Sequence, residues 1–182
     1  MSESYNVFDP ERELRLMFDG PFDLSNLYTK CRSWFEKRQF EFHEFNYKHK
    51  KPMASGQEIQ IKWLGFRNDS EYVRSEIRIW IHVWDLQTFD AIKDNKKVKM
   101  NKGRIRFSFD AFIVTDYRDR WEGSRFSLGL RDFYDKYLLK KKLDLWRTNL
   151  ELETHKLHTH VKELLDMGSK GEEYQLQPGV VW

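Results

Sequence analysis

The sequence has 182 residues, 32 of them basic and 29 acidic, which gives a formal net charge of +3. A chain of this length buries roughly 70% of the surface that its unfolded form exposes, so a single domain needs neither a disulfide nor a structural metal. The near balance of charges argues against the strongly basic composition of a dedicated nucleic-acid-binding protein.

Residues 1–12 contain acids and lack the apolar core of a signal peptide. No window of the chain approaches the ~20 apolar residues of a membrane span. The single cysteine, Cys31, cannot form an internal disulfide, which favours a reducing compartment. We therefore expect a cytoplasmic protein without a transmembrane segment, with residues 1–12 and 168–182 as tails on one domain, residues 13–167.

The first predicted elements are a strand and a helix. Residues 13–18 alternate in polarity, as a strand requires, and Asp19-Gly20-Pro21 predicts a turn after them. Asp23 is placed to cap a helix whose apolar side chains recur at steps of three and four residues. This helix is expected to end near Arg38 and to bury Cys31.

Two further strands are predicted before the centre of the chain. Residues 40–48 have strand character, and the break in alternation at residues 42–45 predicts a bulge. A loop is expected at residues 49–57. Residues 58–66 alternate again, and the polar residues 67–70 predict a turn.

The central feature is a pair of long alternating runs, residues 72–86 and 103–117, which predict paired antiparallel strands. In the first run Ile77, Ile79, Ile81 and Val83 share one face, whereas Arg78, Trp80, His82 and Trp84 share the other. The second run places Ile105, Phe107, Phe109 and Ala111 on one face. The aliphatic face needs a cover, and the aromatic residues, 16% of the chain, must lie in a second core, a cavity or an interface.

Residues 87–102 lie between these runs, where residues 94–96 are the expected reversal and the strands can extend toward it. After residue 117 the periodicity disappears, and residues 130–165 then predict a long amphipathic helix. Its apolar stripe is Leu139, Leu143, Trp146, Leu150, Leu157, Val161, Leu164 and Leu165, with Thr154 filling a gap. An unbroken helix would approach ~50 Å, so we expect a bend or an overhanging end near residues 140–142.

These elements predict an α+β fold, in which a short N-terminal helix and a long C-terminal amphipathic helix cover a curved antiparallel meander sheet. Over residues 13–165 the order of elements resembles the helix-grip folds of the START and plant-allergen-like superfamily. The resemblance implies a hydrophobic cavity between sheet and helix, and members of that superfamily often bind lipids, hormones or polyketides. The short second helix of those folds is not evident here, and no catalytic residue is carried over.

The first functional hypothesis is a non-enzymatic module that binds a hydrophobic small molecule in an apolar pocket between sheet and long helix. The excess of aromatic rings motivates it. The expected lining residues are Phe107, Phe109, Trp146, Ile79 and Ile81.

The alternative is a module that contacts a nucleic acid, another anionic surface or a protein. In a simple meander, the loops at residues 49–51 and 93–102 emerge at one end of the sheet and can form a basic patch. Its lysines are Lys50, Lys51, Lys93, Lys96, Lys97, Lys99 and Lys102. Exposed Trp80, His82 and Trp84 can stack on bases or bury against a partner subunit, as in a homo-oligomer. Lysines in loops also serve solubility alone, which is the simpler interpretation.

Other chemistry finds little support. Glu151, His155 and His158 share one helix face, but without a second cluster of ligands we expect a solvated, titrating face and no metal. Cys31 lies on the packed stripe of its helix, where thiols are inert. Because neither a glycine-rich phosphate loop nor a nucleophile elbow is present, we predict no cofactor and no catalytic residues.

Overall fold

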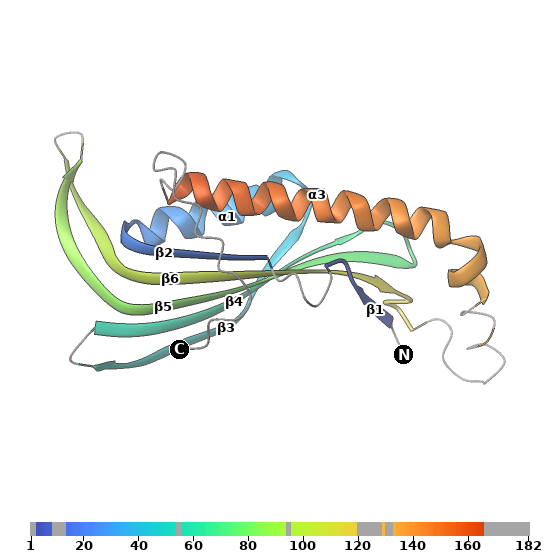
Figure 1. Ribbon diagram of the computed structural model, residues 1–182, viewed down its shortest axis with the longest axis horizontal. Coiled ribbons are helices and arrows are strands. Elements are labelled where there is room, and N and C mark those ends of the chain that lie inside the picture. Colours follow the sequence, from blue (N-terminus) through green and yellow to red (C-terminus); the bar gives the residue numbers. More distant parts are fainter. Residues whose placement is uncertain are drawn as a thin grey trace, which may run out of the picture.

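The computed structural model describes residues 3–8, 14–53, 56–93, 96–119, 129 and 133–165. The fold is α+β: one antiparallel sheet carries both long helices on the same face (Figure 1). The strands are β1 (Glu3–Asn6), β2 (Leu14–Phe22), β3 (Glu41–Met53), β4 (Gly56–Asn68), β5 (Val73–Lys93) and β6 (Lys96–Thr115). The helices are α1 (Leu24–Lys37) and α3 (Lys140–Leu164), and a π-helical turn, Tyr134–Leu138, precedes α3.

The sheet is the predicted meander, with the order β1-β6-β5-β4-β3 and with β2 also paired to β6. The two central runs are neighbours, since Ile79 lies opposite Phe109 and Ile81 opposite Phe107. Both strands continue beyond the predicted limits, so that β5 ends at Lys93 and β6 begins at Lys96. Lys93 pairs with Lys96, and the predicted reversal at residues 94–96 falls on residues 94–95, which lie outside the described part of the chain.

Three predicted irregular segments are wrong. Within the predicted N-terminal tail, Glu3–Asn6 pairs with the end of β6. The predicted turn at residues 19–21 continues β2, which can include Pro21 because an edge strand has one side whose N–H groups need no ladder partner. The predicted loop at residues 49–57 is largely strand, since β3 and β4 pair as far as Met53 and Gly56.

Helix α1 begins as predicted. The Asp23 carboxylate accepts a hydrogen bond from the Asn26 amide at 2.9 Å, which caps the helix. Cys31 and Phe35 are fully buried on the face toward the sheet. Phe35 packs directly over Gly65, where an added Cβ would collide with the phenyl ring. The predicted bulge in β3 is also present, between Glu44 and Asn46.

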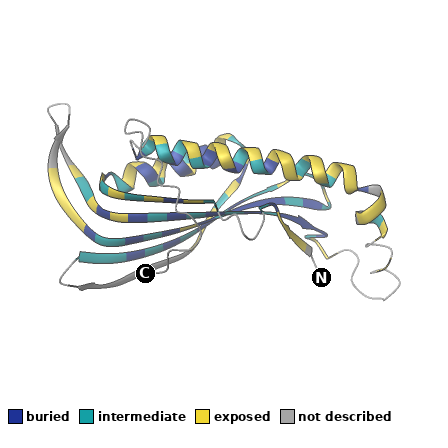
Figure 2. Ribbon diagram, viewed as in Figure 1, coloured by how far each residue is buried: buried dark blue, intermediate teal, exposed yellow. Residues whose placement is uncertain are grey.

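Helix α3 carries the predicted stripe. Leu150, Leu157 and Val161 are fully buried, and the buried Thr154 hydroxyl donates to the Leu150 carbonyl at 2.8 Å. Figure 2 shows buried positions on the sheet and on one side of α3, while the N-terminal part of α3 is mostly exposed. The expected alternative of a bend or an overhanging end is met by a bend, because the π-helical turn ends at Leu138, α3 begins at Lys140, and the ribbon turns between them (Figure 1).

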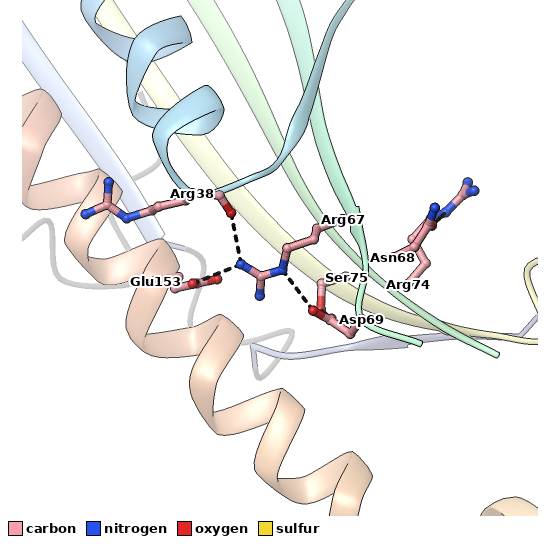
Figure 3. Close-up of polar contacts among 7 residues, drawn as sticks. All are labelled: Arg38, Arg67, Asn68, Asp69, Arg74, Ser75 and Glu153. Atoms are coloured by element: carbon pink, nitrogen blue, oxygen red, sulfur yellow. Dashed lines mark hydrogen bonds and ion pairs between the residues drawn. The ribbon is translucent and has the colours of Figure 1, made fainter. Parts of the chain in front are cut away.

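Arg67, near the end of β4, joins both helices to the sheet (Figure 3). Its guanidinium donates to the Arg38 carbonyl at 3.2 Å and to the Glu153 carboxylate at 3.1 Å. It also donates to Asp69 at 2.8 Å, and the same carboxylate accepts a hydrogen bond from Ser75. One side chain thus joins the C-terminal end of α1, the middle of α3 and the β4–β5 turn.

A bulge at Asp85 bends the sheet at one end. The β5–β6 register shifts between Trp84 and Gln87, and Asp85 has φ of 54°. Gly56 and Gly103 approach this bulge so closely that an added Cβ would lie 2.6 Å and 2.7 Å from its backbone. Because a bulge kinks its strand and increases the local twist, the end of the β5–β6 hairpin curves toward the helix side of the sheet (Figure 1).

Candidate functional site

The residues predicted to line a ligand pocket lie in the hydrophobic core. Ile79, Phe107 and Phe109 are fully buried, Ile81 is 2% exposed, and the partly buried Trp146 packs against the same cluster. The Phe109 ring lies 6.1 Å from that of Phe107 and meets the His158 ring edge-on at 5.5 Å. These residues therefore pack on one another and on α3, and their role in binding a ligand stays a prediction.

The opposite face of the sheet carries the second group of predicted residues. No described helix or strand covers this face (Figure 1). Trp80 is 49% exposed, and the Lys62 ammonium on neighbouring β4 lies 3.6 Å from the centre of its ring. Two residues further along β5, His82 stacks on Trp84 with ring centres 3.8 Å apart. We call this uncovered surface the outer face.

Aromatic rings and cations alternate across the outer face because the strands have a period of two and neighbouring positions pair across the ladder. Arg106 on β6 is directly opposite His82, and its guanidinium lies 5.2 Å from the ring centre of Trp84. Toward the other end, Arg78 lies 4.3 Å from the Phe112 ring. The sheet thus presents flat rings with positive charges beside them.

Carboxylates neutralise only part of this charge. Glu76 pairs with Arg78 at 2.7 Å and Asp85 with Arg104 at 2.7 Å, and the Glu58 carboxylate is hydrogen-bonded to the His82 ring at 2.5 Å. Lys62 and Arg106, in contrast, contact tryptophan rings. The centre of the outer face therefore offers aromatic surface together with cations that are directed to the rings.

The lysine-rich hairpins lie at one end of the sheet, as the meander predicted. The β3–β4 turn follows Met53 and the β5–β6 turn follows Lys93, whereas Asn68 ends β4 at the opposite end. The side chains of Lys50, Lys51, Lys93, Lys96 and Lys97 lie outside the described residues, and Lys99 and Lys102 are exposed. Whether the lysines form one patch stays a prediction.

The β5–β6 hairpin extends beyond its neighbours. Among the described residues, β4 pairs with β5 only as far as Leu86, and β2 pairs with β6 only as far as Asn101. Residues 89–93 and 96–100 consequently pair with each other alone among the described residues. We call this two-stranded extension the arm, and at ~3.3 Å per residue it projects by roughly 15 Å.

The candidate metal ligands do not converge. His155 meets the Phe8 ring edge-on at 5.8 Å, while His158 contacts Phe109. Within the described ranges, no group of three or more histidine, cysteine or acidic side chains is placed to hold a metal ion. Cys31 is fully buried, and burial raises the pKa of its thiol to about 12, so it is a packing residue.

Sequence reasoning missed a groove between α1 and α3. It has a volume of about 690 Å³ and lies between Trp34, Lys37 and Arg38 of α1 and Lys156 and His160 of α3. The only sequence signal is the helical spacing of the lysines on each helix. That spacing does not say which helix faces which.

Of the helices in the described part of the chain, none combines the length and the apolar character needed to cross a membrane. No protein-family model matches the sequence, and no curated protein matches it either.

Proposed function

We propose that the protein binds single-stranded nucleic acid on the outer face of its sheet. The observation that carries the proposal is the half-exposed Trp80 and its neighbour Trp84, each with a cation from an adjacent strand beside its ring. This pairing of flat rings and cations is what a single strand requires.

Bases of a single strand are unstacked and can lie on aromatic rings, each such contact contributing ~1–3 kcal/mol. The phosphates between them need cations, and Lys62 and Arg106 lie on the strands at either side of β5. Antiparallel sheets of RNA-binding domains use surface aromatics in this way. Outward positions along β5 repeat every ~7 Å, so Trp80, His82 and Trp84 form a row on which an extended strand can lie.

The arm supports the same proposal. Its strands carry Lys93, Lys96, Lys97 and Lys99 in sequence, and its base adjoins Trp84 through the Asp85 bulge. A strand lying across Trp80 and Trp84 would continue toward these lysines. Phosphate contacts by lysine position a nucleic acid without reading its sequence, so we expect weak sequence preference.

The test is fluorescence anisotropy of labelled single-stranded homopolymers at low salt. The double variant Trp80→Ala/Trp84→Ala should weaken binding by about tenfold or more, because it removes at least one stacking interaction of ~1–3 kcal/mol. Lys62→Glu/Arg106→Glu should also weaken binding. In this variant the slope of the logarithm of the binding constant against the logarithm of the salt concentration should be less steep by about one for each phosphate that is no longer neutralised. Lys141→Glu/Lys142→Glu, on the exposed side of α3, makes the same charge change and is the control.

Undiminished binding by Trp80→Ala/Trp84→Ala would contradict the proposal, as would wild-type protein that binds no single strand at about 50 mM salt. Self-association that depends on the two tryptophans and is insensitive to salt would show that the outer face is a protein interface instead.

A further inference from the structure

The groove between α1 and α3 lies on the helix side of the sheet, away from the outer face. Its lining comes from one side of each helix, since Lys30, Trp34 and Lys37 recur at steps of three and four on α1. Leu152, Lys156, Thr159 and Glu163 do the same on α3. Trp34 is 5% exposed and forms part of the floor, while Leu152 is exposed at the rim.

The charge of the groove is strongly one-sided. Four permanent cations line it, Lys30, Lys37, Arg38 and Lys156, against one carboxylate, Glu163. Clefts lined by one sign of charge focus the field and concentrate counter-ions. The excess of positive charge fits an anion that carries at least two negative charges.

Part of this lining is held in place. The Arg38 guanidinium lies 4.0 Å from the ring centre of Trp34, and the backbone carbonyl of Arg38 accepts a hydrogen bond from Arg67. Thr159 donates its hydroxyl to the His155 carbonyl at 3.0 Å. An arginine fixed in this way can offer its fork to phosphate oxygens at a smaller entropic cost than a freely rotating side chain.

His160 reports the field inside the groove. Burial lowers the pKa of its imidazole, the nearby Glu163 carboxylate opposes this, and Arg38, Lys30 and Lys37 across the groove lower it further. The nearest His160 nitrogen lies 3.9 Å from the Glu163 carboxylate. Cations that lower the pKa of a histidine are close enough to act together on one bound anion.

From this geometry we propose that the groove binds a ligand through a phosphate group or a diphosphate. Lysines supply point charges and Arg38 supplies paired donors for phosphate oxygens. Trp34 and Leu152 contact the apolar part of the ligand. The phosphate belongs either to a soluble ester or to the headgroup of a phospholipid, and both present the same chemistry to the groove.

The test uses pyrophosphate in solution and vesicles that contain phosphatidic acid. Calorimetry with pyrophosphate, or co-flotation with the vesicles, should show binding by the full-length protein. Lys37→Gln/Lys156→Gln removes one exposed cation from each wall and should weaken binding about tenfold or more, since each tenfold change corresponds to ~1.4 kcal/mol. Lys141→Gln/Lys142→Gln, outside the groove lining, should leave it unchanged.

Histidine NMR gives a readout at the site. Bound pyrophosphate should raise the pKa of His160, because the anion offsets Arg38, Lys30 and Lys37.

Failure of both pyrophosphate and vesicles to bind would overturn the proposal, and so would binding that weakens equally in the two lysine variants. Trp80→Ala/Trp84→Ala should still bind, so failure here is distinguishable from failure of the nucleic-acid proposal. Loss of binding in Lys62→Glu/Arg106→Glu alone would place the anion on the sheet and contradict the groove.

Discussion

His158 shows how a single position on α3 can make stability depend on pH. Its pKa is lowered from the ordinary 6.5, first by burial and then by Lys162, against the raising effect of a hydrogen bond with the Arg15 backbone. The nearby His155 lowers it further. The unfolded chain therefore takes up the proton more readily than the folded chain below pH 6.5.

This difference predicts that the free energy of unfolding falls as the pH falls. The contribution of a neutral His158 is fully present above pH 6.5, and it is lost as the pH drops through the lowered folded-state pKa. Urea unfolding should be measured between about pH 7 and 5, which lies above the range in which most carboxylates titrate. Over this range the free energy of unfolding should fall less steeply for His158→Gln than for the wild-type protein. The pKa of His160 is lowered in the same direction. The double variant His158→Gln/His160→Gln should therefore show an even weaker dependence of the free energy of unfolding on pH. An unchanged slope in both variants would refute this.

The two faces of β5 give a matched pair of substitutions at adjacent positions. Ile79 is fully buried in the core, whereas Trp80 is 49% exposed on the outer face. Ile79→Asp places an unpaired carboxylate in the core and should cost several kcal/mol, enough to prevent folding. Trp80→Asp should change the free energy of unfolding by no more than about 1 kcal/mol. Circular dichroism and urea unfolding distinguish them, and comparable effects would contradict the assignment of faces.

At the scale of elements, Arg67 connects the helices to the sheet. It reaches α1, α3 and the β4–β5 turn through three hydrogen bonds. Its side chain is 24% exposed and that of Asp69 is 9% exposed, so the ion pair is well shielded. One partly buried guanidinium is therefore hydrogen-bonded to both helical segments.

Arg67→Met should lower the free energy of unfolding by ~2–4 kcal/mol, because Asp69 and Glu153 lose their shared cation in a shielded site. The control is Arg32→Met, which removes only an exposed ion pair with Glu36 on α1 and should leave the free energy of unfolding nearly unchanged. Adding Glu153→Gln to Arg67→Met should recover part of the loss. Equal effects of Arg67→Met and Arg32→Met in urea unfolding would show that the helices are held by apolar packing alone.

For the whole molecule, the arm is separable from the core. Residues 89–93 and 96–100 pair only with each other within the described chain, and an isolated two-stranded hairpin is marginally stable. Replacing residues 89–100 by an Asn-Gly turn should therefore change the free energy of unfolding by no more than about 1 kcal/mol. The same replacement removes the four lysines of the arm, which are Lys93, Lys96, Lys97 and Lys99. It should therefore weaken binding of single-stranded nucleic acid.

The charge variant Lys96→Glu/Lys97→Glu/Lys99→Glu separates the arm's charge from its presence. It should change stability by no more than ~0.5 kcal/mol per site and still weaken binding of the oligonucleotide. If shortening the arm unfolds the protein, the arm belongs to the folding unit. Unchanged binding in both variants would remove the arm from the proposed nucleic-acid surface.

Local periodicity by itself determined much of this protein. The alternation along residues 72–86 assigned Ile79 to the core and Trp80 to the outer face, and the step of three and four in α3 identified Leu150, Leu157 and Val161 as its buried stripe. The cap at Asp23 was also readable. These features depend on side chains a few residues apart, whose direction follows from the geometry of one strand or helix.

Only the tertiary structure decided the features that need a distant partner. Glu3–Asn6 is a strand because the end of β6 offers it a free edge, and residues 19–21 stay extended because β2 continues along the same edge. The arm exists because β4 and β2 end before β5 and β6 do. The basic groove forms because the packing of α1 beside α3 brings Lys37 and Lys156 together. Such pairings depend on contacts between residues far apart in the chain, which no local period encodes.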